Sequence, residues 1–330
     1  MNTTTTFLAC GALMLGIALP AHSTPQESFL EARAGAGLLE GTLLRPDSPP
    51  TATVLMIPGS GPTDRDGNSP LGLKASTYRL LAEGLAARGV ATLRVDKRGM
   101  YASATAAPDA NAVTIPDYVA DVDAWVAVLR KQTGAPCVWV LGHSEGGLVA
   151  LASAQSPGVC GLVLVSAAGR PLGDVLREQI AANPANAALV APAAQAIAAL
   201  EKGQRVDVTP LPAALQGLFR PQVQGFLISD LSYDPGKLIA DVRKPVLVLQ
   251  GQRDIQVGEA DARRLKQMDP GAELVLLPGV NHVLKFVPSD DRQANVATYA
   301  DPSLPLAPGV VDAIAGFLSR NAPGDGKQAP

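Results

Sequence analysis

The chain has 330 residues, of which 47% are hydrophobic and 17% are charged, and its formal net charge at pH 7 is −3. This length favours one large domain with an insertion over two equal domains. The sequence has no run of basic residues, which argues against a nucleic-acid partner. The three histidines and three cysteines do not stand at the spacing of metal ligands, so we expect no metal site.

The first 23 residues have the character of an export signal. Residues 7–19 form an apolar stretch that is short for a membrane span and suits the hydrophobic region of a signal peptide. Small residues follow, with a cleavage site at residues 21–23, although residues 1–6 contain no Lys or Arg. We expect an exported protein, periplasmic or extracellular, without stable membrane insertion. Lipidation at Cys10 is a weaker alternative.

After an edge hairpin at residues 28–45, strands alternate with helices up to residue 168. The strand segments are short apolar runs, and they lie at residues 52–57, 90–95, 137–141 and 161–165. The helical segments lie at residues 76–88, 116–132 and 146–154. This alternation predicts an α/β fold with a parallel sheet covered by helices on both faces.

The alternation fails at residues 170–241, which are rich in Ala, Pro, Gln and Leu and contain no convincing strand. Helical stretches at residues 185–201 and 211–232 predict a helical cap that would roof the carboxyl ends of the strands and shape a pocket. The pattern resumes with strands at residues 245–251 and 273–278 and a last helix at residues 308–319. The expected units are a core (residues 24–169 and 242–322), a cap (residues 170–241) and a flexible tail (residues 323–330).

The pentapeptide from Gly142 to Gly146 matches the G-x-S-x-G pattern of a nucleophile elbow, with Ser144 at its centre. A buried strand precedes it and a helix follows it, which is the context that this pattern requires. Glycine suits both outer positions, because a Cβ atom would collide across so tight a turn. We therefore expect Ser144 to project from the sheet as the nucleophile of a serine hydrolase.

A serine nucleophile needs a histidine base, and the positions of the histidines leave one candidate. His22 lies in the predicted signal peptide and His143 lies inside the elbow, so His282 is the only free imidazole of the mature chain. It follows the predicted strand at residues 273–278, and functional groups of parallel sheets gather at the carboxyl ends of the strands. His282 is therefore the predicted base.

The acid of such a triad is expected between the serine and the histidine in the chain. Asp254 meets this condition, because it stands on the loop after the strand at residues 245–251. Its expected role is to orient His282 and to stabilise the charged form of the ring. Asp230 and Asp234, at the end of the cap, are the alternatives.

Two backbone N–H groups are expected to stabilise the oxyanion that forms during acyl transfer. One belongs to Glu145, directly after the nucleophile, and the other to Ser60, on the Gly-rich loop after the strand at residues 52–57. Each such donor contributes about 3 kcal/mol. The nearby cluster of residues 64–66 has two interpretations. We favour a polar turn whose charges pair with each other or with Lys97 and Arg98, and the alternative is an Arg65 that holds a substrate carboxylate or supports the oxyanion loop.

Cys137 and Cys160 are the only cysteines of the predicted mature chain, and each begins one of two neighbouring parallel strands. Neighbouring strands lie about 4.8 Å apart, which is within the Cα range of a disulfide. In an exported protein these cysteines are candidates for a disulfide, and two buried free thiols are the alternative.

With these features the chain resembles the α/β-hydrolase superfamily over residues 28–320. More narrowly, it resembles bacterial esterases of the serine aminopeptidase and monoacylglycerol lipase-like branch. The motifs that carry the resemblance are Ile57–Asn68, Asp96–Gly99, Gly142–Gly147, Gly251–Val257 and Asn281–Lys285. The resemblance implies an eight-stranded, mostly parallel sheet, no cofactor, and hydrolysis of a small-molecule carboxylic ester through an acyl-enzyme.

Two other functions stay open at this point. An aminopeptidase or amidase of the same fold would need a negatively charged patch to hold a substrate amine, for which Glu145 and Glu178 are the nearest candidates. A catalytically silent member that binds a ligand would be indicated by a broken triad or oxyanion loop, and the sequence contains neither. No pattern predicts the acyl chain length, the alcohol group or the oligomeric state.

Overall fold

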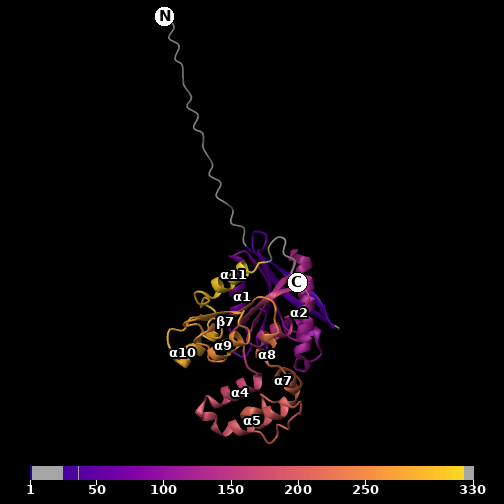
Figure 1. The fold of residues 1–330 in the computed structure, drawn as a ribbon, viewed down its shortest axis with the longest axis vertical. Coiled ribbons are helices and arrows are strands. Elements are labelled where there is room, and N and C mark those ends of the chain that lie inside the picture. Colours follow the sequence, from indigo (N-terminus) through magenta and orange to yellow (C-terminus); the bar gives the residue numbers. More distant parts are fainter. Residues whose placement is uncertain (2–24, 36, 323–330) are drawn as a thin grey trace.

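A computed structural model of the chain describes residue 1 and residues 25–35 and 37–322 (Figure 1). The predicted signal peptide, apart from Met1, lies outside the described residues, and so does the predicted tail at residues 323–330. None of the helices in the described part is long and apolar enough to cross a membrane.

The centre of the molecule is one eight-stranded sheet with the strand order β1-β2-β4-β3-β5-β6-β7-β8. Its strands are β1 (Gln26–Ala34), β2 (Gly37–Arg45), β3 (Ala52–Ile57), β4 (Val90–Val95), β5 (Val138–His143), β6 (Val159–Val165), β7 (Val246–Gly251) and β8 (Glu273–Leu277). The pairs β1–β2 and β2–β4 are antiparallel, and the other pairs are parallel. The predicted mostly parallel, eight-stranded α/β sheet is thus confirmed.

Helices cover both faces of the sheet. Successive side chains of a buried strand point to opposite faces, so the strands contribute to two separate cores, one beneath each layer of helices. In β5, Val138 and Val140 enter one core, whereas Trp139 and Leu141 enter the other. The first core also receives side chains from α2 (Ile115–Thr133), α3 (Glu145–Ala152), α8 (Pro235–Ala240) and α9 (Glu259–Met268). The second core receives them from α1 (Thr77–Ala86) and α11 (Val310–Arg320). The short helix α10 (Arg292–Ala297) follows β8.

Between β6 and β7 the chain forms a group of helices at one end of the sheet (Figure 1). They are α4 (Leu172–Ala181), α5 (Ala187–Glu201), α6 (Ala213–Gln216) and α7 (Gln224–Leu231), and they share a small core of their own. The stretch at residues 211–232, which we predicted to be helical, is divided into α6 and α7. Pro221 divides it because it has no N–H to donate and because it keeps Arg220 extended, at φ −53° and ψ 145°.

The structure joins Cys137 and Cys160 by a disulfide, with their Cα atoms 5.2 Å apart. Cys137 directly precedes β5, and Cys160 is the second residue of β6. The two cysteines are 23 residues apart in the chain, and the loop that they close contains Ser144. The bridge therefore restrains the unfolded chain around the predicted nucleophile.

We expect Cys137 and Cys160 to contribute no titratable thiol after denaturation of protein that was produced in an oxidising compartment and purified without reductant. The paired substitutions Cys137→Ala and Cys160→Ala should lower its free energy of unfolding by about 3 kcal/mol, the chain-entropy value for a loop of this length. Thiol titration and chemical denaturation measure the two effects, and reduced wild-type protein is the control for the substitutions. Two titratable thiols in the unreduced protein would contradict the prediction.

Candidate active site

Ser144 occupies the turn between β5 and α3, and its backbone has φ 54° and ψ −120°, a strained conformation for a residue with a side chain. Its N–H donates to Val165 O over 2.9 Å, which fastens the turn to β6. A Cβ at Gly142 would lie 2.0 Å from Gly146 O, and a Cβ at Gly146 would lie 2.4 Å from Ile57 O. Glycine is therefore required at both positions: at Gly142 because of the predicted collision across the turn, and at Gly146 because β3 packs against it.

Asp254 and His282 meet at the carboxyl ends of β7 and β8, where His282 Nδ1 lies 2.8 Å from Asp254 Oδ2. The other oxygen, Asp254 Oδ1, accepts hydrogen bonds from the N–H groups of Gln256 (2.8 Å) and Val257 (2.9 Å). Burial raises the pKa of Asp254, but His282 and these backbone donors outweigh it and hold the pKa below its usual value. An ionised Asp254 keeps the proton of a neutral His282 on Nδ1, so Nε2 can accept a proton.

Ser144 lies at the same edge of the sheet as this pair. Within the described residues, no hydrogen bond joins Ser144 Oγ to His282, whose polar contacts run through Nδ1 and the carbonyl oxygen. The rings of His282 and of His143, the residue before Ser144, have centroids 4.8 Å apart. Serine–histidine hydrogen bonds in free enzymes are often long and tighten with substrate, so this placement is compatible with a triad.

His143 connects the elbow to the loop of His282. Its Nε2 lies 2.8 Å from His282 O, and its Nδ1 lies 2.9 Å from Tyr78 Oη. Because a carbonyl only accepts, Nε2 carries the proton and Nδ1 accepts from the Tyr78 hydroxyl, which itself accepts from Gly59 N–H at 2.9 Å. Burial, and then the charge of His282, lowers the pKa of His143 to about 3. His143 is therefore neutral and fully engaged, and no signal in the sequence pointed to Tyr78.

We expect Tyr78→Phe to lower the free energy of unfolding by about 1–3 kcal/mol, because it leaves Gly59 N–H and His143 Nδ1 buried without partners. Tyr101→Phe is the matched control, since its hydroxyl bonds to a carbonyl oxygen at the surface and its loss should cost less than about 0.5 kcal/mol. Chemical denaturation of the two variants and the wild type measures the difference. If the two variants lost equal amounts of unfolding free energy, the buried hydrogen bonds of Tyr78 would contribute no more to stability than the surface hydrogen bond of Tyr101.

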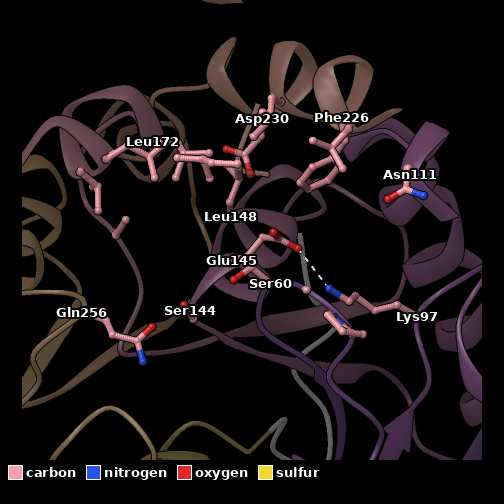
Figure 2. A pocket seen from close by; sticks show the side chains of 18 of the residues that line it. Ser60, Lys97, Asn111, Ser144, Glu145, Leu148, Leu172, Phe226, Asp230 and Gln256 are labelled. Atoms are coloured by element: carbon pink, nitrogen blue, oxygen red, sulfur yellow. Dashed lines mark hydrogen bonds and ion pairs between the residues drawn. The ribbon is translucent and has the colours of Figure 1, made fainter. Parts of the chain in front are cut away.

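The two predicted oxyanion donors, Ser60 and Glu145, face the same space from the loop after β3 and the start of α3 (Figure 2). In the part of the chain that the structure describes, neither backbone N–H donates to a protein acceptor. Lys97 supports both segments, because its Nζ donates to Gly59 O over 2.7 Å and lies 3.3 Å from Glu145 Oε1. Lys97 was predicted as a possible partner of the charges at residues 64–66, but it pairs with Glu145 instead, 48 positions away in the chain.

The charged cluster after β3 forms ion pairs with Arg94 of β4 and with Asp96, the residue directly after β4. Arg65 donates through Nε and Nη2 to Asp96 Oδ2 over 2.9 and 2.6 Å, and its backbone N–H donates to Asp96 Oδ1 over 2.8 Å. Asp66 pairs with Arg94, whose side chain is buried. The charges are paired, as the favoured interpretation required, but with Asp96 and Arg94 rather than with each other or with Lys97 and Arg98. These contacts fasten the loop that carries Ser60.

A pocket of about 620 Å³ opens beside Ser144, between the sheet and the helices of the cap (Figure 2). This volume suits a small molecule. The core contributes Ser60, Lys97, Ser144, Glu145 and Gln256 to its lining, and the cap contributes mainly the apolar side chains of Leu172, Val175, Leu176, Leu218, Phe226 and Leu227. Among residues 25–35 and 37–322, no group of three or more His, Cys, Asp or Glu side chains could hold a metal ion.

Of the other acidic residues that the sequence singled out on the cap, one faces the pocket. Asp230, on α7, lines the pocket and is only 3% exposed. Asp234 instead caps the start of α8, and Glu178 has a side chain that is 61% exposed. Asp254 is therefore the carboxylate bonded to His282, whereas Asp230 lies in the lining of the pocket.

The sequence is similar to a known protein family and to a known esterase. Residues 54–299 match the family model described as the alpha/beta hydrolase family. Esterase EstD from Thermotoga maritima is 26% identical over 271 residues, which are 81% of this chain and 62% of that protein. The chain thus spans about three fifths of the length of this curated relative.

Solved structures share the fold at lower sequence identity. Est1E from Butyrivibrio proteoclasticus has a TM-score of 0.55 and 17% identity, and the similarity covers 89% of this chain and 98% of that one. Proline iminopeptidase from Mycobacterium smegmatis has a TM-score of 0.56 and 20% identity, with coverage of 89% and 99%. At these identities the similarity shows the fold and does not decide the substrate.

Proposed function

The chain belongs to the alpha/beta hydrolase family, and on that premise we propose that it is a serine hydrolase that cleaves carboxylic esters through an acyl-enzyme intermediate. The observation that carries the proposal is the 2.8 Å contact between Asp254 and His282 at the sheet edge where the elbow holds Ser144. Similarity to Esterase EstD supports an ester as the substrate class. The motifs of the chain further support a place among bacterial esterases of the serine aminopeptidase and monoacylglycerol lipase-like branch.

In the proposed reaction, Ser144 Oγ attacks the ester carbonyl while His282 Nε2 takes the hydroxyl proton. Asp254 stabilises the resulting imidazolium, and the N–H groups of Ser60 and Glu145 donate to the oxyanion. His282 then returns the proton to the leaving alcohol oxygen, which leaves the acyl group on Ser144. Water, deprotonated by the same ring, releases the acid and restores the enzyme.

The substrate in this proposal is a small-molecule ester whose apolar part lies against the cap. The location in the cell is also part of the proposal: the protein is exported to the periplasm or the medium. The apolar segment at residues 7–19 and the disulfide between Cys137 and Cys160 support export, because disulfides persist in oxidising compartments.

An aminopeptidase or amidase of the same fold is the second candidate. The observation in its favour is the carboxylate of Asp230, which lines the pocket on the cap side while Glu145 lines it on the core side. Carboxylates near the reacting carbonyl are what a substrate amine would need.

Hydrolysis of p-nitrophenyl esters with increasing acyl length tests the proposal, with an aminoacyl p-nitroanilide as the comparison. We expect saturable turnover of the esters, much slower cleavage of the anilide, and loss of activity after treatment with a fluorophosphonate. Faster cleavage of the anilide than of the esters would identify an amidase. A protein that cleaves neither substrate and takes up no fluorophosphonate would be a catalytically silent, ligand-binding member.

A further inference from the structure

Asp230 is a buried carboxylate that faces the pocket without a protein partner. It is 3% exposed, it lines the pocket from α7, and within the described residues its side chain makes no hydrogen bond or ion pair. A buried charge without a partner is costly, and in a binding site a ligand can supply the missing partner. Asp230 therefore has the properties of a ligand-binding group rather than of a structural one.

The charges on the core side of the pocket do not neutralise Asp230. Figure 2 shows Glu145 and Lys97 joined to each other below Asp230, and Lys97 Nζ lies 3.3 Å from Glu145 Oε1. Asp230 takes no part in this ion pair. Burial and the charge of Glu145 raise the pKa of Asp230 well above its usual value, whereas Lys97 lowers it. A positive charge inside the pocket would favour the ionised form of Asp230.

The other cationic side chains of the lining are engaged elsewhere. Arg170 donates through Nε and Nη2 to Asp261 over 3.0 and 2.8 Å. Arg220 is exposed and donates to Asn111 Oδ1 over 2.9 Å. Neither guanidinium is bonded to Asp230, so within the described lining its carboxyl group remains available to a cationic ligand.

We propose that Asp230 and Glu145 form an ammonium-binding subsite, and that the preferred substrates are esters with a protonated amine a few atoms from the scissile carbonyl. The inference rests on the proposed function, and the position of Glu145 sets the geometry. The backbone N–H of Glu145 is a proposed oxyanion donor, while its side chain lines the pocket on the side opposite Asp230 (Figure 2). An ammonium has three N–H donors, enough to bind both carboxylates while the apolar lining holds the carbon skeleton.

The test compares L-leucine ethyl ester with ethyl 4-methylpentanoate, which has the same carbon skeleton without the amine. The ammonium group also makes the amino ester intrinsically more reactive, so the two substrates cannot be compared directly. The measured quantity is therefore the ratio of their kcat/KM values in each variant, relative to the same ratio in the wild type. Asp230→Asn keeps the shape of the side chain and removes its charge, and we expect it to lower the ratio of amino ester to neutral ester at least about tenfold. Asp234→Asn is the matched control, since this aspartate caps α8 and does not line the pocket, and its ratio should equal that of the wild type.

A second measurement needs no variant. Butylammonium should inhibit hydrolysis of the neutral ester competitively and at least about tenfold more strongly than 1-butanol, which has a similar shape and no charge. Equal inhibition by the two compounds, or an unchanged ratio in Asp230→Asn, would overturn the subsite while hydrolysis of neutral esters left the proposed function standing. Failure to cleave any ester would overturn both.

Discussion

Ser144→Ala is expected to lower kcat for ester hydrolysis by about four to six orders of magnitude, because the members of a triad act as a unit. The substitution removes only the hydroxyl, and alanine tolerates the φ of 54° no worse than serine does, so the fold should persist. A fluorophosphonate probe should add its mass to the wild type and leave the variant unmodified. Intact-mass spectrometry and initial rates measure the two effects.

Ser166→Ala is the matched control for this experiment. Ser166 also has a positive φ, 49°, and stands just after β6, but its hydroxyl is fully buried and has no hydrogen-bond partner within the described residues. This variant should keep both its activity and its reaction with the probe. Equal labelling of Ser144→Ala and the wild type would show that the nucleophile is another residue.

Asp254→Asn is expected to lower kcat about 10³–10⁴-fold with little change in structure. The amide can still accept hydrogen bonds from the N–H groups of Gln256 and Val257, so the loop should keep its shape. The amide nitrogen, however, can donate to His282 Nδ1, which favours the tautomer with the proton on Nε2. The ring then cannot accept the proton of Ser144, and no carboxylate stabilises its charged form.

Circular dichroism and initial rates on a neutral ester measure this effect, with Asp234→Asn as the control. That aspartate accepts a hydrogen bond from Gly236 N–H over 3.0 Å, and asparagine caps helices equally well, so the control should keep the wild-type rate. Near-full activity of Asp254→Asn would place the acid elsewhere. Asp230 would then be tested next.

The sequence by itself determined the sheet and the candidate nucleophile, because both depend on local patterns. Alternation of strands and helices predicted the parallel sheet, and the two cores that receive Val138 and Trp139 from opposite faces follow from the pleat of a strand. The elbow was readable because Gly142 and Gly146 meet backbone at 2.0 and 2.4 Å, a constraint that only glycine meets. His282 followed by elimination, since histidine is rare in this chain.

Other features depended on contacts between distant segments. The prediction of one helical stretch at residues 211–232 was wrong in detail. It followed the helix-favouring composition of the segment and did not take into account that Pro221 interrupts the helix. The bond between Tyr78 and His143 joins residues 65 positions apart, and the bond between Lys97 and Glu145 joins residues 48 positions apart. No local periodicity encodes such partners.

Only the tertiary structure decided what the acidic residues near the site do. Asp230, Asp234 and Asp254 look alike in the sequence, since each lies close to a predicted turn or strand end. In the structure, Asp254 bonds to His282, Asp234 caps a helix, and Asp230 is left buried in the pocket without a partner. The physical reason is that the charge state and role of a carboxylate depend on burial and on the donors around it, and these are supplied by segments that come together only when the cap folds over the sheet.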